Sequence, residues 1–223
     1  MTPRHHLDPS TVMAYAAGAL SLELGVIVAT HLAACAHCRR QVRDAERIGG
    51  LLVEQQQAAA VDDSRREGLR AAMLERLGES VPALPPRRHD DADAGDPDRL
   101  PAPLHPYFGT SLHGLRWRWM APGVHCIRAR RSGGGSLFML KIAPGRSMPL
   151  HSHGRSELTQ ILQGAYSDAL GHFAPGDVAD LDSDVLHQPV TVPGVPCICV
   201  AALDAPLRFP GWLARRLQPL VGL

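Results

Sequence analysis

The stretch that decides the fold is His31-Leu-Ala-Ala-Cys35-Ala-His-Cys38, which places an imidazole close to two thiols. Zinc binds histidine nitrogen and cysteine sulfur in a tetrahedron, with bonds of about 2.0–2.3 Å. His31 and Cys35 share the face of a predicted helix whose apolar positions include Leu24, Ile27, Val28 and Leu32. A straight helix would place Cys38 about 10 Å along the axis from His31. We therefore expect the chain to turn near Cys35 and Cys38 to open the next helix.

A tetrahedral site at this stretch needs a fourth ligand, and the nearest upstream candidates are His5 and His6. A Cys-x2-Cys pair alone is also compatible with a redox pair or with two packed thiols. The histidine four residues before the pair and the two histidines near the N-terminus favour zinc. His37, between the two cysteines, is expected to point outward.

This stretch resembles the His-x3-Cys-x2-Cys signature of zinc-containing anti-sigma factors. In that family a small helical domain binds and occludes a sigma factor of the extracytoplasmic-function class, and an upstream histidine completes the metal site. The resemblance thus implies a protein-binding role for the N-terminal part of the chain.

The charge balance argues against direct binding of nucleic acid. The chain has 223 residues with 23 basic and 22 acidic side chains, a formal net charge of +1, and phosphate binding needs concentrated positive charge. The N-terminus lacks the apolar core of a signal peptide, and no apolar run is long enough to span a bilayer. We expect a cytoplasmic protein that does not bind membranes and whose five cysteines are reduced.

Patterning along the chain predicts an α+β protein of two domains. Helical patterns cover residues 8–20, the segment from Ser21 to Cys35, residues 38–57, and a stretch after the polar break at residues 62–64. Residues 79–103 are rich in proline and aspartate and are predicted to be a linker. From about Leu104 onward, short alternating runs between turns predict a jelly-roll barrel. The expected domains are a zinc-binding bundle of about four helices at 1–78, the linker at 79–103 and an all-β domain at 104–223.

A second group of potential ligands lies in the β region, in Gly145-x5-His151-Ser-His153-Gly-Arg-Ser-Glu157-x6-Gly164. His151 and His153 are two residues apart, so on a strand they project from the same face. Glu157 adds a carboxylate, and imidazole with carboxylate suits zinc, iron, manganese or nickel. The simplest alternatives are surface residues on a turn and a barrel without metal.

This spacing resembles the first motif of the cupins at every anchor. The second motif is less complete: Pro175-Gly176-Asp177 supplies its turn and His187 stands at the position of the last ligand. Asp182-Ser-Asp184 replaces the usual Pro-x-Gly, and Val190 replaces an asparagine. His187 is a predicted ligand by position, in altered surroundings.

A zinc motif, a linker and a cupin in this order resemble the ChrR-type anti-sigma factors over nearly the whole chain. The resemblance implies a first zinc site of His6 (or His5), His31, Cys35 and Cys38, and a second site for zinc or another divalent metal at His151, His153, Glu157 and His187. It also implies inhibition of an extracytoplasmic-function sigma factor, with release in response to oxidative stress such as singlet oxygen sensed through the cupin. Function is then binding rather than catalysis. The alternative is a metal-dependent cupin enzyme, a dioxygenase or isomerase, with an accessory zinc domain.

Overall fold

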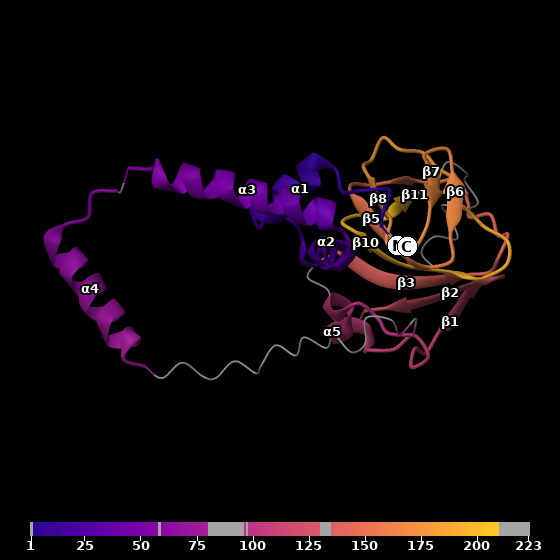
Figure 1. The fold of residues 1–223 in the computed structure, drawn as a ribbon, viewed down its shortest axis with the longest axis horizontal. Helices are drawn as coiled ribbons and strands as arrows, with labels where there is room; N and C mark the ends of the chain where they lie inside the picture. Colours follow the sequence, from indigo (N-terminus) through magenta and orange to yellow (C-terminus); the bar gives the residue numbers. More distant parts are fainter. Residues whose placement is uncertain (1, 58, 80–95, 97, 130–134, 210–223) are drawn as a thin grey trace. The chain divides into compact units, whose positions relative to one another are not determined.

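The structure, a computed structural model, describes residues 2–57, 59–79, 96, 98–129 and 135–209, with helices first and strands after them (Figure 1). The helical elements are α1 (Pro9–Ala16), α2 (Leu22–Ala34), α3 (Ala36–Glu54), α4 (Asp63–Leu77), the 3-10 turn η2 (Ala102–Leu104) and α5 (His105–Phe108). No helix among these residues is both long and apolar enough to cross a membrane.

Short polar side chains set where the helices begin. The Ser21 hydroxyl accepts a hydrogen bond from the Leu24 backbone N–H (3.4 Å), and the Asp62 carboxylate accepts one from Arg65 N–H (2.8 Å). Cys35 separates α2 from α3 in an extended conformation (φ −104°, ψ 102°). The predicted turn at Cys35 is confirmed, and Cys38 lies in the first turn of α3.

In the described part of the chain, the strands form three antiparallel sheets. Six strands pair in the order β1-β2-β3-β10-β5-β8, three in the order β7-β6-β9, and β11 pairs with β4. Their bounds are β1 Arg118–Ala121, β2 Val124–Arg128, β3 Ser136–Ile142, β4 Ser152–His153, β5 Glu157–Gln163, β6 Tyr166–Asp168, β7 Gly171–Phe173, β8 Val178–Leu181, β9 Val190–Thr191, β10 Cys197–Leu203 and β11 Leu207–Arg208. A helical N-terminal part followed by a cupin-like β fold confirms the predicted fold class.

The central strands of the large sheet are buried on both faces, and their alternate residues point to opposite sides. On β5, Leu158 packs in the cluster that contains the α2 residues Ile27 and Val28, whereas Ile161 packs in the barrel interior. On β10, Val200 faces α2 and Cys199 faces the interior. Figure 1 shows α2 beside β5 and β10, in agreement with the contacts between these elements.

The compact units of the structure differ from the predicted domain boundaries. One unit consists of Met1–Gly49 with Asp98–Leu223, and the other of Gly50–Pro97. The reason is the apolar face of α2, which is covered by the outer face of the sheet rather than by other helices alone. An amphipathic pattern shows that a face is buried but not which partner buries it.

The end of the predicted linker is part of this core. Leu100, inside the predicted linker, and Leu104, directly after it, are 2% and 0% exposed and belong to the same cluster as Ile27. Leu100 thus extends the packed region upstream of Leu104, the predicted start of the β domain. Residues 80–95 and 97, which make up most of the predicted linker, lie outside the described residues.

Candidate metal centres

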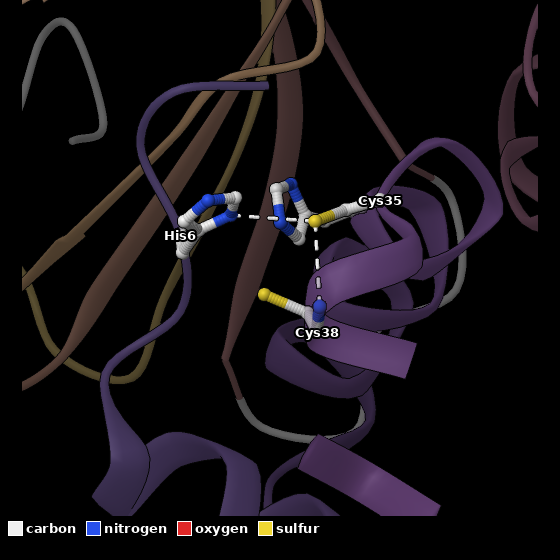
Figure 2. Close-up of side chains that lie close together, drawn as sticks. His6, Cys35 and Cys38 are labelled. Atoms are coloured by element: carbon white, nitrogen blue, oxygen red, sulfur yellow. Dashed lines mark hydrogen bonds between the residues drawn. The ribbon is translucent and has the colours of Figure 1, made fainter. Parts of the chain in front are cut away.

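Four side chains of the N-terminal region converge on one point. His6 precedes α1, His31 lies in the last turn of α2, Cys35 lies between α2 and α3, and Cys38 lies in α3. One potential ligand atom of each lies within 4.8 Å of the others. Figure 2 shows the side chains of His6, Cys35 and Cys38 close together, with dashed lines from the Cys35 sulfur to His6 and to Cys38. Of the two histidines predicted as the fourth member, the structure brings His6 to the group.

His31 has the orientation of a metal ligand. Its Nδ1–H donates to the carbonyl oxygen of Gly176 at 3.0 Å, so in the neutral ring Nε2 has the free lone pair. Among the described residues this buried Nε2 has no hydrogen-bond partner. Burial lowers the pKa of His31 to about 4, which keeps the ring neutral at pH 7. A neutral imidazole held through Nδ1 is the form that binds a metal.

The two thiols complete a donor set that suits zinc. The Cys35 sulfur lies 3.3 Å from Nδ1 of His6 and accepts the backbone N–H of Cys38 at 3.4 Å. Burial raises the pKa of Cys38 to about 11, so without a cation this thiol is protonated, whereas a bound dication favours the thiolate. Two imidazoles and two thiols fit a closed tetrahedral site, which has no open position for a substrate.

The second group consists of His151, His153 and His187, whose ligand atoms lie within 4.8 Å of one another. All three are buried, at 8%, 0% and 3% exposure. The backbones of His151 and His187 exchange two hydrogen bonds, His151 N–H to His187 O at 3.1 Å and the reverse at 3.0 Å. This pairing sets the two rings beside each other although the residues are far apart in sequence.

Each of the three rings uses Nδ1 for an outer hydrogen bond. The acceptors are the Pro149 carbonyl (2.8 Å), the Asp182 carbonyl (3.3 Å) and the Asp168 carboxylate (2.8 Å), for His151, His153 and His187 in that order. The Nε2 atoms of His151 and His187 then face each other at 3.2 Å. Nitrogen lone pairs directed at one point, with the opposite nitrogens held by oxygen acceptors, are typical of metal-binding histidines.

Glu157, the fourth predicted member, contacts the group at one imidazole. Its Oε2 lies 2.9 Å from Nε2 of His153, and its Oε1 accepts the Thr159 hydroxyl at 2.8 Å. Burial would raise the pKa of Glu157, but His153 and His151 outweigh burial and lower it. Burial would lower the pKa of His153, but the Glu157 carboxylate outweighs burial and raises this pKa. The structure therefore places an ionised carboxylate beside the histidines, though not within 4.8 Å of all three ligand atoms.

A cavity of about 500 Å³ adjoins these histidines inside the barrel. His151, Glu157 and His187 contribute to its wall, and the rest of the lining is mainly apolar: Met120, Phe138, Leu140, Met148, Cys197, Cys199 and Leu207 are among it. Burial raises the pKa of Cys197 to about 12, and that of Cys199 well above its ordinary value, so both thiols are protonated at neutral pH. This group therefore borders a space that a small molecule can occupy.

Sequence reasoning missed the residues that orient the ligands. Asp168 on β6 belongs to no motif, and Asp182 was noted only as a departure from the second motif. Their roles as hydrogen-bond acceptors follow only from the packing of distant segments. Gly176 and Asp177 were recognised as a turn, but nothing in their spacing connects them to His31 or to the N-terminal segment.

Comparison with known proteins gives similarity over the whole chain. Residues 108–205 match the profile of a family described as the ChrR cupin-like domain. The anti-sigma-E factor ChrR of Cereibacter sphaeroides is 37% identical to this chain over 219 residues, which is 98% of each sequence. The crystal structure of Rhodobacter sphaeroides SigE in complex with the anti-sigma ChrR includes a chain that matches with a TM-score of 0.70 and 33% identity, over 92% of this chain and 100% of that one.

Proposed function

We propose, because the chain belongs to the family of ChrR-type anti-sigma factors, that it binds a sigma factor of the extracytoplasmic-function class and so keeps it from RNA polymerase. The observation that supports this most strongly is the extent of the similarity, which includes both the helical part and the cupin rather than the cupin alone. The role is regulatory binding, not catalysis.

The surface that we assign to the sigma factor lies on the unit that contains α4. This helix buries no residue, and its apolar side chains Leu69, Met73, Leu74 and Leu77 are 55–79% exposed. Leu51, Leu52 and Val53 at the end of α3 are exposed as well. A helix of this length is marginal in water on its own, and its apolar face is stabilised when a partner covers it.

For the metals we propose zinc in the first group, with a structural role, and zinc or another divalent ion in the second. The closed set of His6, His31, Cys35 and Cys38 supports zinc by its chemistry. In the second group we include Glu157 with the three histidines, because its carboxylate lies 2.9 Å from Nε2 of His153. A bound ion there would hold the barrel wall and offer a coordination position toward the cavity.

We further propose that the cupin senses the signal that releases the sigma factor, and that the signal is oxidative stress such as singlet oxygen in the cytoplasm. The cavity beside the histidines supports this, because its wall contains two thiols and two thioethers, Cys197, Cys199, Met120 and Met148. Methionine thioethers are oxidised to sulfoxides without first losing a proton, whereas thiols that burial keeps protonated react less readily.

The test of sigma binding is co-expression with each extracytoplasmic-function sigma factor of the same genome, followed by affinity capture and a sigma-dependent reporter. One sigma factor should be captured and its reporter silenced. Leu69→Asp and Met73→Asp should weaken capture more than tenfold, whereas Ala71→Asp, on the opposite face of α4, should not. Failure of the metal-loaded chain to retain any of these sigma factors would refute the proposal.

Sensing is tested separately with His187→Ala and Glu157→Ala in the same reporter strain, with and without a photosensitiser that generates singlet oxygen. If the cupin senses the signal, basal reporter activity stays low and induction is reduced. If these variants lack the second metal and still respond normally, the cupin site is not the sensor. If reporter activity without the photosensitiser is raised in these variants, the cupin instead contributes to inhibition of the sigma factor.

A further inference from the structure

The segment that contains His6 is held in place by the cupin. Asp177, at the turn between β7 and β8, accepts hydrogen bonds at Oδ1 from the backbone N–H groups of Arg4 (2.6 Å) and His5 (3.0 Å). Two residues beyond His6, the N–H of Asp8 donates to Asp180 at 2.9 Å. His6 thus lies between two anchored points, and these fix the direction from which its ring approaches Cys35.

The side chain of His5 strengthens this attachment. Its ring stacks on Phe173 with centroids 4.1 Å apart, and its Nε2–H donates to the carbonyl of His172 at 3.0 Å. His5 therefore binds the β6–β7 hairpin and is turned away from the metal group. This explains physically why His6 and not its neighbour reaches the cysteines.

The same turn orients a second ligand. The Gly176 carbonyl accepts Nδ1–H of His31, and this hydrogen bond aims the unpaired Nε2 at the other ligand atoms. Gly176 has φ +94°, a conformation that residues with a Cβ rarely adopt, and an added Cβ would lie 3.3 Å from the Pro3 ring. Glycine is thus required where the N-terminal segment passes over the turn.

The turn is itself fixed at three points. The second oxygen of Asp177 accepts the Ala174 N–H at 2.9 Å, and the backbone of Ile161 on β5 accepts from Gly176 N–H (2.9 Å) and donates to Asp177 O (3.1 Å). Asp177 is 2% exposed, so its carboxylate is committed to these amides rather than to water. A turn with this many bonds is rigid enough to position groups outside the barrel.

We propose that the cupin turn Ala174–Asp177 is the outer coordination shell of the N-terminal metal group, with Asp177 as a positioning residue for His6 and the Gly176 carbonyl as the orienting group for His31. The affinity of that group for zinc then depends on a residue of the cupin. Outer-shell partners of this kind typically change metal affinity by about 10–100-fold. The proposal rests on the metal assignment above and is independent of sigma binding.

The variant that tests the proposal is Asp177→Asn in the full chain. The carboxylate accepts from three N–H groups through two oxygens, whereas asparagine has one acceptor oxygen and an NH2 group that donates. In the asparagine variant, either the bonds from Arg4 and His5 or the bond from Ala174 must therefore be lost. Asp177→Ala removes all three. Asp44→Asn, on an exposed face of α3, is the matched control for loss of a carboxylate.

The measurement is cobalt(II) titration of the metal-free chain, followed by displacement with zinc. A thiolate-to-cobalt charge-transfer band reports the group that contains Cys35 and Cys38, because the second group has no thiol ligand. We expect Asp177→Asn to weaken cobalt and zinc binding about 10-fold, Asp177→Ala up to about 100-fold, and Asp44→Asn less than 2-fold.

A purely architectural role for Asp177 would lower the thermal midpoint without moving this affinity. Binding by Asp177→Asn that stays within 2-fold of the wild type would therefore overturn the proposal, and this criterion holds even if Asp177→Ala fails to fold. If the wild type gives no charge-transfer band, the metal assignment is wrong and the proposal fails with it.

Discussion

The carboxylate of Asp168 lies 2.8 Å from Nδ1 of His187, and its side chain is fully buried. A carboxylate in this position keeps the proton of the neutral ring on Nδ1 and leaves Nε2 to face His151. The orientation of His187 is thus set by a residue on a different strand, β6.

Asp168→Ala should weaken metal binding at the second group by about 10–100-fold, because His187 loses the partner that fixes its ring. Isothermal titration of the metal-free chain with zinc, resolved into two sites, measures this. The cobalt charge-transfer band of the first group should not change. Asp184→Ala, which removes an exposed carboxylate from the same region, should leave both affinities unaltered; an equal loss in this control would contradict the role of Asp168.

Ile27→Ala should destabilise the sheet as well as α2. Ile27 is fully buried against strand residues, and removal of buried methyl groups from an isoleucine typically costs about 2–5 kcal/mol. Ile48→Ala, at a position 50% exposed on α3, should change the free energy of unfolding by less than about 0.5 kcal/mol.

Urea unfolding of the metal-loaded chain, followed by tryptophan fluorescence, reports on the packed face of the sheet through Trp117, which packs against the cluster that contains Ile27. If Ile27→Ala leaves this transition unmoved while helical circular dichroism changes, then α2 and the sheet do not unfold together.

Cys38→Ser should remove about one zinc equivalent per chain, since the closed site loses one of its four ligands. Hydrogen exchange should rise at the start of α3, where the metal supplies the connection, and less at residues 4–8, where backbone amides also donate to Asp177 and Asp180. It should stay slow in α2, because Ile27 and Val28 remain packed on the sheet. Asp44→Asn is the control: Asp44 is exposed on α3 and outside the group, so zinc content should be unchanged. Fast hydrogen exchange throughout α2 would contradict the expectation that the sheet, and not the metal, stabilises this helix.

The metal-free chain should lose stability on acidification from about pH 6.5 to pH 4. Burial holds the pKa of His31 near 4, below the value of 6.5 in the unfolded chain, so the unfolded state binds more protons in this interval. For His31 alone the loss amounts to roughly 3 kcal/mol at most.

Burial also lowers the pKa of His151, which adds a loss of the same sign, whereas the raised pKa of His153 opposes it. Urea midpoints measured at several pH values, with a chelator present, check this. A midpoint that is constant or rises toward pH 4 would contradict the expected net loss of stability.

Sequence spacing was sufficient to predict the features of the fold that involve residues close together in the chain. The helical spacing of His31 and Cys35 together with zinc chemistry predicted the turn between α2 and α3, and the structure has that turn. The spacing of His151, His153 and Glu157 predicted that these side chains form one group, and the position of His187 in the second motif added it to them. The structure brings the three histidines together and places Glu157 at the edge of the group.

Long-range partners could not be predicted. The apolar stripe around Ile27 indicated burial but not the sheet that buries it, so the expected domain boundaries put α2 in a separate bundle. The hydrogen bond from His31 to Gly176 joins residues 145 positions apart, and no sequence periodicity extends over that distance. The same holds for Asp168 and His187, which come together only when β6 and the segment before β9 pack.

The packing of α2 on β10 has a consequence for how the chain is made. Translation runs at about 5–20 residues per second, so on the order of ten seconds or more pass between synthesis of Ile27 and of Val200. During that interval β10 has not yet formed the centre of the sheet between β3 and β5, and the apolar face of α2 remains uncovered on the ribosome. A nascent chain of this kind is a natural client for chaperones, and a product truncated before residue 197 would keep that face open to proteases.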